Sequence, residues 1–136
     1  MFRKLLKTGN HNSATSFALL IFRVGISLMM LTHGYPKFQK ILDGNFKFSD
    51  PLGLGSEVSL VLVVLAEFVC SLLLSLGLVS RLALMPLITA MSVALFIAHG
   101  DDPFSTQEKS ALYLLSFLFL LITGPGKYSV DRKLFG

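Results

Sequence analysis

Four long apolar stretches, separated by shorter polar segments, dominate the hydrophobic pattern of the chain. They cover approximately residues 16–34, 56–77, 81–98 and 105–124. A helix rises about 1.5 Å per residue, so roughly 20 apolar residues cross the hydrocarbon core of a bilayer. In lipid the backbone must bond within its own segment or close a barrel, and these stretches are too long and too evenly apolar for barrel strands. The pattern predicts an all-α membrane four-helix bundle, a single domain over residues 1–136.

The fourth stretch is the shortest, because its continuous apolar part begins only after Lys109. Ser105 and Glu108 have the spacing of a capping box, in which two side chains satisfy the free amides of a first helical turn. We therefore expect this helix to begin near Ser105. The basic N-terminus before the first stretch is also typical of a signal peptide, but no small-x-small cleavage pattern follows, which favours an uncleaved span.

Composition agrees with a lipid environment, since 53% of the residues are hydrophobic and only 15% are charged. The net charge is +4, yet the basic residues lie at the ends of the apolar stretches instead of in one patch, so we expect no nucleic-acid partner. The lone Cys70 lies inside the second stretch, which excludes thiol pairing within one chain.

Lysine and arginine are distributed unevenly between the two sides of the predicted bundle. The side with the N-terminal tail, the turn at Arg81 and the C-terminal tail carries more of them than the side with the other two loops. The positive-inside rule then places both termini in the cytoplasm. We expect a multi-pass protein of the inner (cytoplasmic) membrane, with the lipid bilayer as its first partner.

Glu67 is the most informative polar position, because it lies near the middle of the second stretch. A charge at this depth costs roughly 2.5–3.5 kcal/mol on insertion scales, so it should be paired, protonated or turned to a polar cavity. Arg23 lies about 10 Å inside the first stretch, and the two α-carbons would differ in depth by about 5 Å. Two interpretations stay open: a structural Arg23–Glu67 ion pair, or a role for Glu67 with protons or a ligand.

A second group of polar residues maps to the outer ends of the first, third and fourth stretches: His33, Lys37, His99, Glu108 and Lys109. Such a cluster could bind a polar headgroup, relay protons or ligate a metal. Two histidines fix too little geometry for zinc, so we expect no metal site. Haem held between His33 and His99 is disfavoured, because interfacial histidines more often form hydrogen bonds.

The long first loop, residues 35–55, is amphipathic. Residues 36–42 alternate lysine with large apolar side chains, which is typical of a short helix lying in the membrane interface. The loop is either a binding lid or a segment tucked over the mouth of the bundle. Motifs of hydrolases, phosphate loops, dinucleotide sites and metalloproteases are missing from the sequence, so independent catalytic activity is not expected.

Together these positions resemble the DoxX-like family of small four-helix membrane proteins, from about residue 17 to residue 131. The resemblance uses LIFRVG at 20–25, HGYPKF at 33–38, Glu67 with Gly77 ending its helix, His99, Glu108-Lys109 and GPGKYSVD at 124–131. It implies links to sulfur and respiratory redox chemistry, including small subunits of thiosulfate:quinone oxidoreductases and partners in oxidative-stress complexes. A quinone is then the candidate ligand.

The resemblance also implies roles for residues of this chain. Arg23, His33, Lys37, Glu67, His99 and Glu108 would be the polar family positions, with Asp131 closing the cytoplasmic end against Arg81. The lack of a cysteine pair departs from related bundles that perform thiol chemistry. Three functions follow as hypotheses: a subunit of a quinone-linked redox complex, a structural or assembly subunit of a larger membrane complex, and a small proton-coupled carrier, which would need an oligomer.

Overall fold

The computed structural model describes residues 2–136, and over that range its regular elements are helices, with no strand. The prediction of an all-α fold is confirmed. Two short helices lie near the chain ends, α1 (Phe2–Leu5) and α7 (Val130–Phe135). The longer elements are α2 (Ser13–Leu42), a continuous run of α3 (Ser56–Val64), η1 (Leu65–Cys70) and α4 (Ser71–Leu76), a second run of α5 (Ser80–Val93) and η2 (Ala94–Ala98), and α6 (Phe104–Thr123).

Three of the helical runs are long and apolar enough to cross a membrane: Ser13–Leu42, Ser56–Leu76 and Ser80–Ala98. They cover the first three predicted stretches, and the first run extends well beyond its stretch. α6 covers the fourth with 20 residues, and its first turns are polar, so its crossing stays a prediction. The expected capping box at Ser105 is wrong, because α6 begins at Phe104 after Pro103 and has no side-chain cap.

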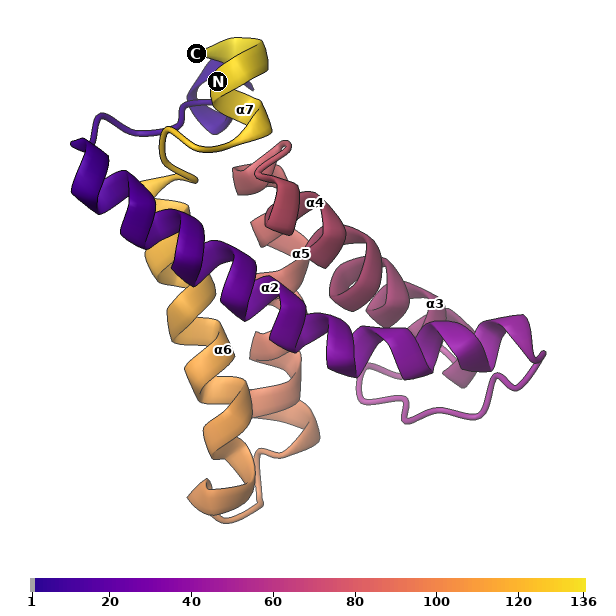
Figure 1. Cartoon of the computed structure of the whole chain (residues 1–136). Helices are drawn as coiled ribbons and strands as arrows, with labels where there is room; N and C mark the ends of the chain where they lie inside the picture. The colour runs from indigo at the N-terminus through magenta and orange to yellow at the C-terminus, as the bar shows by residue number, and fades with distance from the viewer. Residues whose placement is uncertain (1) are drawn as a thin grey trace.

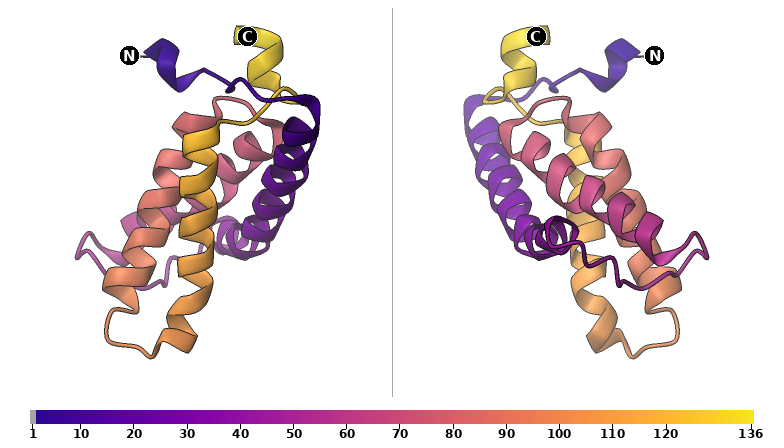
Figure 2. Two further views of the ribbon diagram at one scale, coloured as in Figure 1. Left: turned by 90° about the vertical axis from the view of Figure 1, so that its left-hand side faces the viewer. Right: turned by 90° about the vertical axis from the view of Figure 1, so that its right-hand side faces the viewer.

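α2 continues past Gly34, where the apolar pattern placed the end of the first span. Pro36 lies inside the helix, where it has no amide for the preceding turn and commonly causes a kink. Figures 1 and 2 show that α2 changes direction toward its end. The expected interfacial helix at residues 36–42 is therefore helical, but it is the bent continuation of α2 and not a separate element.

The helices pack around one apolar core. α5 lies along α6, and α2 crosses η1 and α4. The largest side chains buried between them include Phe117, Met30 and Leu84. Many other large apolar residues are exposed, Ile122 at 80% among them, and a surface of this kind is explained by contact with lipid.

Arg23 joins three distant segments at the end of the molecule that carries both termini. It is 2% exposed. Its Nη1 donates to the carbonyl oxygen of Pro125 at 2.7 Å, and its Nη2 donates to the carbonyls of Tyr128 at 3.0 Å and Ser75 at 3.4 Å. The predicted Arg23–Glu67 pair is therefore wrong, because the guanidinium extends toward the chain ends, where Nη1 and Nη2 donate to backbone carbonyls.

Asp131 closes the same end, but not against Arg81 as predicted. Its carboxylate accepts the amides of Val79 at 2.7 Å and Ser80 at 2.9 Å, at the start of α5, where the helix dipole favours a negative charge. Arg81 instead donates to backbone carbonyls, including that of Leu121 near the end of α6 at 2.9 Å. Asp131 and Arg81 thus each connect a helix end to another segment through hydrogen bonds to the backbone.

Candidate functional site

A cavity of about 300 Å³ lies between α2, η1, the α5–η2 run and α6, away from the chain ends. Its polar lining combines side chains that are far apart in the sequence. The lining comprises His33, Lys37, Glu67, His99, Thr106, Lys109, Ser110 and Tyr113, with Met30, Met91 and Ala94 as its apolar part.

Helical spacing brings these side chains to one place. Met30, His33 and Lys37 are three and four residues apart on α2, and Lys109 and Tyr113 are four apart on α6. Residues at such spacings share one helix face. Lys37 reaches the cavity only because α2 continues past its predicted end, so the length of α2 decides the composition of the site.

Gly34 allows α2 to approach η1 closely. A Cβ atom at this position would lie 2.5 Å from the carbonyl oxygen of Glu67, a distance that side chains do not tolerate. Glu67 itself lies in η1, a π-helical turn of the kind that recurs at functional sites. The contact between the two backbones places the Glu67 carboxylate beside the next turn of α2, which carries Lys37.

Lys37 and Glu67 form an ion pair at the wall of the cavity. Lys37 Nζ donates to both carboxylate oxygens, at 2.7 and 2.9 Å. The side chain of Glu67 is 6% exposed and that of Lys37 is 27% exposed. A buried carboxylate needs such a partner because its desolvation is otherwise uncompensated. Lys37 therefore has the role that the sequence interpretation gave to Arg23.

Aromatic rings surround the pair. Lys37 Nζ lies 5.8 Å from the centre of the Phe48 ring, a cation–π distance, and Phe48 belongs to the loop between α2 and α3. On the cavity side, the rings of His33 and Tyr113 meet edge to face with centres 5.7 Å apart. The loop after α2 thus returns to the ion pair.

Asp50 fixes this loop to the start of α3. Its carboxylate accepts the amides of Leu54 at 2.8 Å and Gly55 at 2.9 Å and the hydroxyl of Ser59 at 2.9 Å. The hydrogen bond from the Gly55 amide, followed by that from Ser59, lowers the pKa of Asp50 below its ordinary value. The segment that carries Phe48 is therefore held at its far end by an ionised carboxylate.

Four members of the predicted outer cluster line the cavity, namely His33, Lys37, His99 and Lys109. Glu108 does not, because it lies exposed on α6. His99 also contacts Asp102, with Nδ1 and Oδ2 2.8 Å apart. Within residues 2–136, no three His, Cys, Asp or Glu side chains are grouped closely enough to hold a metal ion.

Sequence interpretation missed several lining residues, of which Tyr113 is the most informative. It is 9% exposed, and its ring lies between His33 and the core residue Phe117. Its spacing of four from Lys109 on one helix could have indicated it. Met30 and Met91 carried no comparable signal, because apolar residues occur throughout these helices.

Comparison with known proteins places the chain in a family. Residues 18–100 match the sequence model of the DoxX family. An uncharacterized protein of Haemophilus influenzae is 32% identical, over 88% of this chain and 92% of its own length. The inner membrane protein YphA of Escherichia coli is 27% identical, over 94% and 98%, and the uncharacterized membrane protein Rv3486 of Mycobacterium tuberculosis is 28% identical, over 86% and 81%. No solved structure matches.

A second inner membrane protein of Escherichia coli, YqjF, is 27% identical over 85% of this chain. That two of these relatives are inner membrane proteins agrees with the helices of spanning length and the exposed apolar surface of this chain. The chain is a multi-pass protein of the inner membrane, and it belongs to the DoxX family.

Proposed function

We propose that the chain is a small membrane subunit of a quinone-linked redox complex and that it holds the polar head of a quinone in the cavity. The observation that carries this function is the position of the Lys37–Glu67 pair. The pair lies at the wall of a cavity that also receives two histidines, a second lysine and a tyrosine. An ionisable group inside a membrane segment is a functional candidate by default.

The lining suits a ring that carries carbonyl oxygens. Lys109, His33 and Tyr113 bear hydrogen-bond donors, while Met30 and Met91 supply apolar contact. The cavity, at about 300 Å³, lies at the lower end of the range of about 300–1,000 Å³ for ligand sites. Lys109 has no acceptor or ion-pair partner in the part of the chain that the structure describes, so its ammonium is free for a ligand oxygen.

Proton handling would fall to the ion pair. A bound quinone accepts protons and electrons together, and these electrons would come from the larger complex. Lys37 Nζ donates to both oxygens of Glu67, at 2.7 and 2.9 Å, so the pair holds its exchangeable protons on the ammonium beside the cavity without moving either helix. His33 lies on the same face of α2, four residues before Lys37, and extends this polar line into the cavity.

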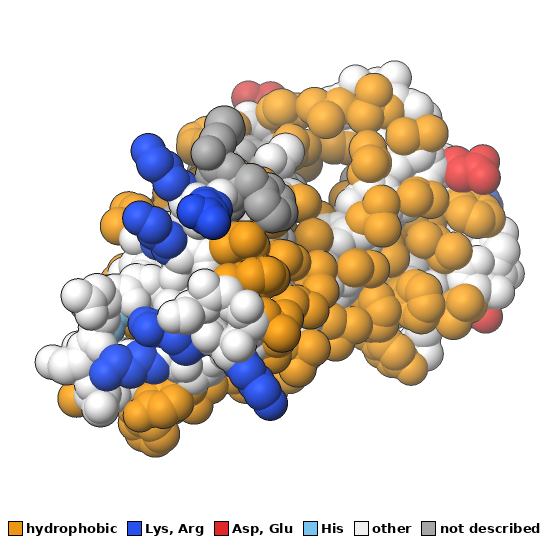
Figure 3. Space-filling view, turned by 90° about the horizontal axis from the view of Figure 1, so that it is seen from above, with side chains coloured by type: hydrophobic (Ala, Val, Ile, Leu, Met, Phe, Trp, Pro, Cys, Tyr) orange, Lys and Arg blue, Asp and Glu red, His pale blue; other side chains and the backbone are white. Residues whose placement is uncertain are grey.

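We further infer four crossings, with both termini in the cytoplasm. Figures 1 and 2 show both chain ends at the same end of the bundle, as an even number of crossings requires. α6 lies along α5, which supports its crossing as the fourth helix. In Figure 3, which looks onto the end with the termini, lysine and arginine side chains gather there, in agreement with the positive-inside rule.

The alternative is a structural or assembly subunit of a larger membrane complex with no redox role. The Gly34 contact favours it, because an ion pair directly beside a tight backbone crossing can serve to lock α2 onto η1. In that case the cavity would be a by-product of packing, and substitutions that leave the ion pair intact would have no effect in cells.

Extraction of the full chain from its native membrane in a mild detergent separates the two functions. Chromatography measures quinone per protein, and mass spectrometry identifies co-purifying proteins. We expect the wild type to retain quinone together with an oxidoreductase, and Lys109→Met and Tyr113→Phe to lose quinone while leaving the ion pair in place. Lys127→Met, an exposed lysine at the other end, is the matched control. A quinone-free wild type with a partner of another kind would establish the structural alternative.

A further inference from the structure

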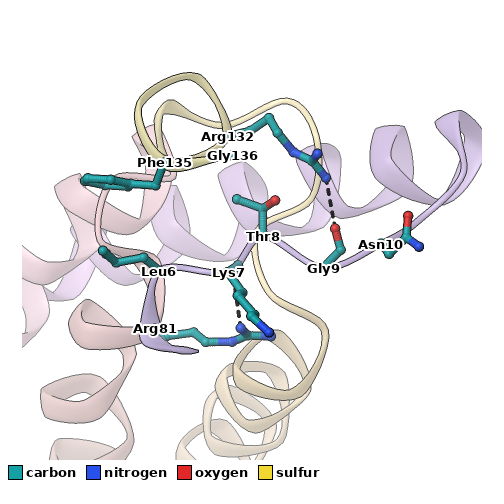
Figure 4. Close-up of a pocket in the computed structure, with 9 residues that line it drawn as sticks. All are labelled: Leu6, Lys7, Thr8, Gly9, Asn10, Arg81, Arg132, Phe135 and Gly136. Carbon is teal, nitrogen blue, oxygen red and sulfur yellow. Dashed lines mark hydrogen bonds between the residues drawn. The ribbon is translucent and has the colours of Figure 1, made fainter. Parts of the chain in front are cut away.

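A second cavity, of about 390 Å³, lies at the end of the molecule that carries both termini (Figure 4). It shares no lining residue with the quinone cavity. The residues drawn in Figure 4 come from three separate parts of the chain: the N-terminal segment, the start of α5, and α7 with the residue that follows it. Three of its side chains are cationic, Lys7, Arg81 and Arg132, and none of its side chains is acidic.

No acidic side chain that the structure describes forms an ion pair with these cations. Arg132 Nη2 donates to the carbonyl oxygen of Gly9 at 2.9 Å, and Arg81 is likewise bonded to backbone carbonyls, Lys7 among them. Within residues 2–136, neither guanidinium forms an ion pair, and the ammonium of Lys7 has no acceptor. Carbonyl oxygens orient an arginine but leave its full charge, so the side chains that line the cavity have a net positive charge.

The cavity lies at the end of a helical run that is long and apolar enough to cross a membrane. Arg81 stands at the start of α5, a run of spanning length, and donates from Nη2 to the Ile122 carbonyl near the end of α6. Two apolar side chains, Leu6 and Phe135, also line the cavity. A site that combines cations with apolar side chains at the end of a membrane helix matches a lipid, which has a charged head and an apolar body.

We propose that this cavity binds the phosphate headgroup of an anionic phospholipid. Arginine presents donors in a geometry that suits phosphate oxygens, and lysine adds a mobile positive charge. Juxtamembrane basic residues are attracted to anionic lipids in the same way. Because the N-terminal segment, α5 and α7 all contribute, a bound headgroup would also tie the two chain ends to the bundle.

Native mass spectrometry of the full chain in detergent tests this site, with phosphatidylglycerol as the probe and phosphatidylcholine as the zwitterionic comparison. We expect retention of phosphatidylglycerol over phosphatidylcholine. Lys7→Gln and Arg132→Gln should each weaken phosphatidylglycerol binding about fivefold, the effect of removing one basic residue at a membrane surface. Lys133→Gln is the matched control, because Lys133 lies exposed on α7 and does not line the cavity.

Arg132→Gln removes a hydrogen bond to Gly9 and could destabilise the fold, so the thermal midpoint is measured for every variant. The Lys7 ammonium forms no hydrogen bond with described residues, and Lys7→Gln decides the test if Arg132→Gln unfolds. Equal retention of the two lipids, or equal losses in Lys7→Gln and Lys133→Gln, would overturn the site. Inorganic phosphate that displaces phosphatidylglycerol from the wild type would identify a free oxyanion site and overturn the lipid assignment.

Discussion

The two ends of this bundle bind their buried charges in different ways. At the terminal end, Arg23 and Asp131 bond to backbone carbonyl and amide groups of distant segments. At the other end, Lys37 and Glu67 bond to each other beside an open cavity. A charge that is bonded to the backbone cannot change partners unless the fold opens, whereas a side-chain pair can share its atoms with a ligand. We therefore interpret the terminal end as a structural lock, in which Arg23 and Asp131 hold distant segments together. The cavity end is the site that we propose binds a ligand.

Arg23→Met should have the largest effect, because it leaves three carbonyl oxygens at the lock without their donor. We expect a loss of about 2–4 kcal/mol in the free energy of unfolding, since each stranded buried group costs roughly 1–3 kcal/mol and water replaces part of the loss. Thermal unfolding in detergent measures it. Arg3→Gln, at an exposed arginine of α1, is the control and should stay near the wild type. Equal thermal midpoints for Arg23→Met and Arg3→Gln would show that the hydrogen bonds of Arg23 do not stabilise this end of the bundle.

Gly34→Ala should have the next largest effect, at the crossing of α2 and η1. The added methyl group would lie 2.5 Å from the Glu67 carbonyl oxygen, so the helices must separate, at a cost of about 1–3 kcal/mol. Gly25→Ala on the same helix meets nothing within 4 Å and should be neutral or slightly stabilising. Thermal midpoints and quinone retention are compared for both. If Gly34→Ala keeps both properties, the site does not depend on this contact.

The Lys37–Glu67 pair should have a smaller effect on stability. Glu67→Gln and Lys37→Met alone should each cost about 1–2 kcal/mol in the free energy of unfolding, less than in a dry core, because Lys37 is 27% exposed and can turn to water. The double variant should cost less than the sum of the single variants. A thermodynamic double-mutant cycle measures this coupling. Strict additivity would show that the two side chains do not interact in solution.

Asp50 should give the smallest effect, confined to the loop beside the site. Hydrogen bonds from Gly55 and then Ser59 lower the pKa of its carboxyl group in the folded loop. Its contribution to loop stability is therefore complete above about pH 3.9, the unfolded value, and is lost as the pH falls through the lower folded value. Hydrogen exchange at the Leu54 and Gly55 amides, corrected for the intrinsic rate, should accelerate over that range.

Asp50→Asn is the matched variant for the loop. We expect its Leu54 and Gly55 amides to exchange faster at neutral pH and to show no step in acid. Protection that is equal in the variant and the wild type would mean that the loop is held by other contacts, such as those of the Phe48 ring with Lys37 and Lys40.

The sequence predicts how deep a residue lies within a membrane helix, but it does not predict the direction in which the side chain extends. The position of Glu67 indicated a buried carboxylate, which the structure has, and Gly77 ends its helical run with a φ of 69°, as the sequence indicated. The partner was mispredicted because depth alone does not say which way an arginine extends. Free carbonyls at the Gly-Pro-Gly turn, Pro125 among them, attract Arg23 in the folded chain.

Helix length caused the second error. The apolar pattern stops at Gly34, so the sequence predicts a separate interfacial segment for Lys37, outside the first span. Membrane helices tolerate proline when neighbouring groups satisfy the freed carbonyls, and α2 continues. The family segment HGYPKF thus contains both the contact residue Gly34 and the ion-pair residue Lys37, and their connection depends on a tertiary contact that periodicity does not report.

The π-helical turns η1 and η2 flank the cavity on two successive helices, and they make its composition sensitive to chain length. A π-helical turn has i→i+5 hydrogen bonds and holds more residues than an α-helical turn, so deleting one residue within η1 would return the run to α-helical geometry and remove the turn that carries Glu67. Insertions and deletions, more than substitutions, would then exchange the side chains that face the cavity.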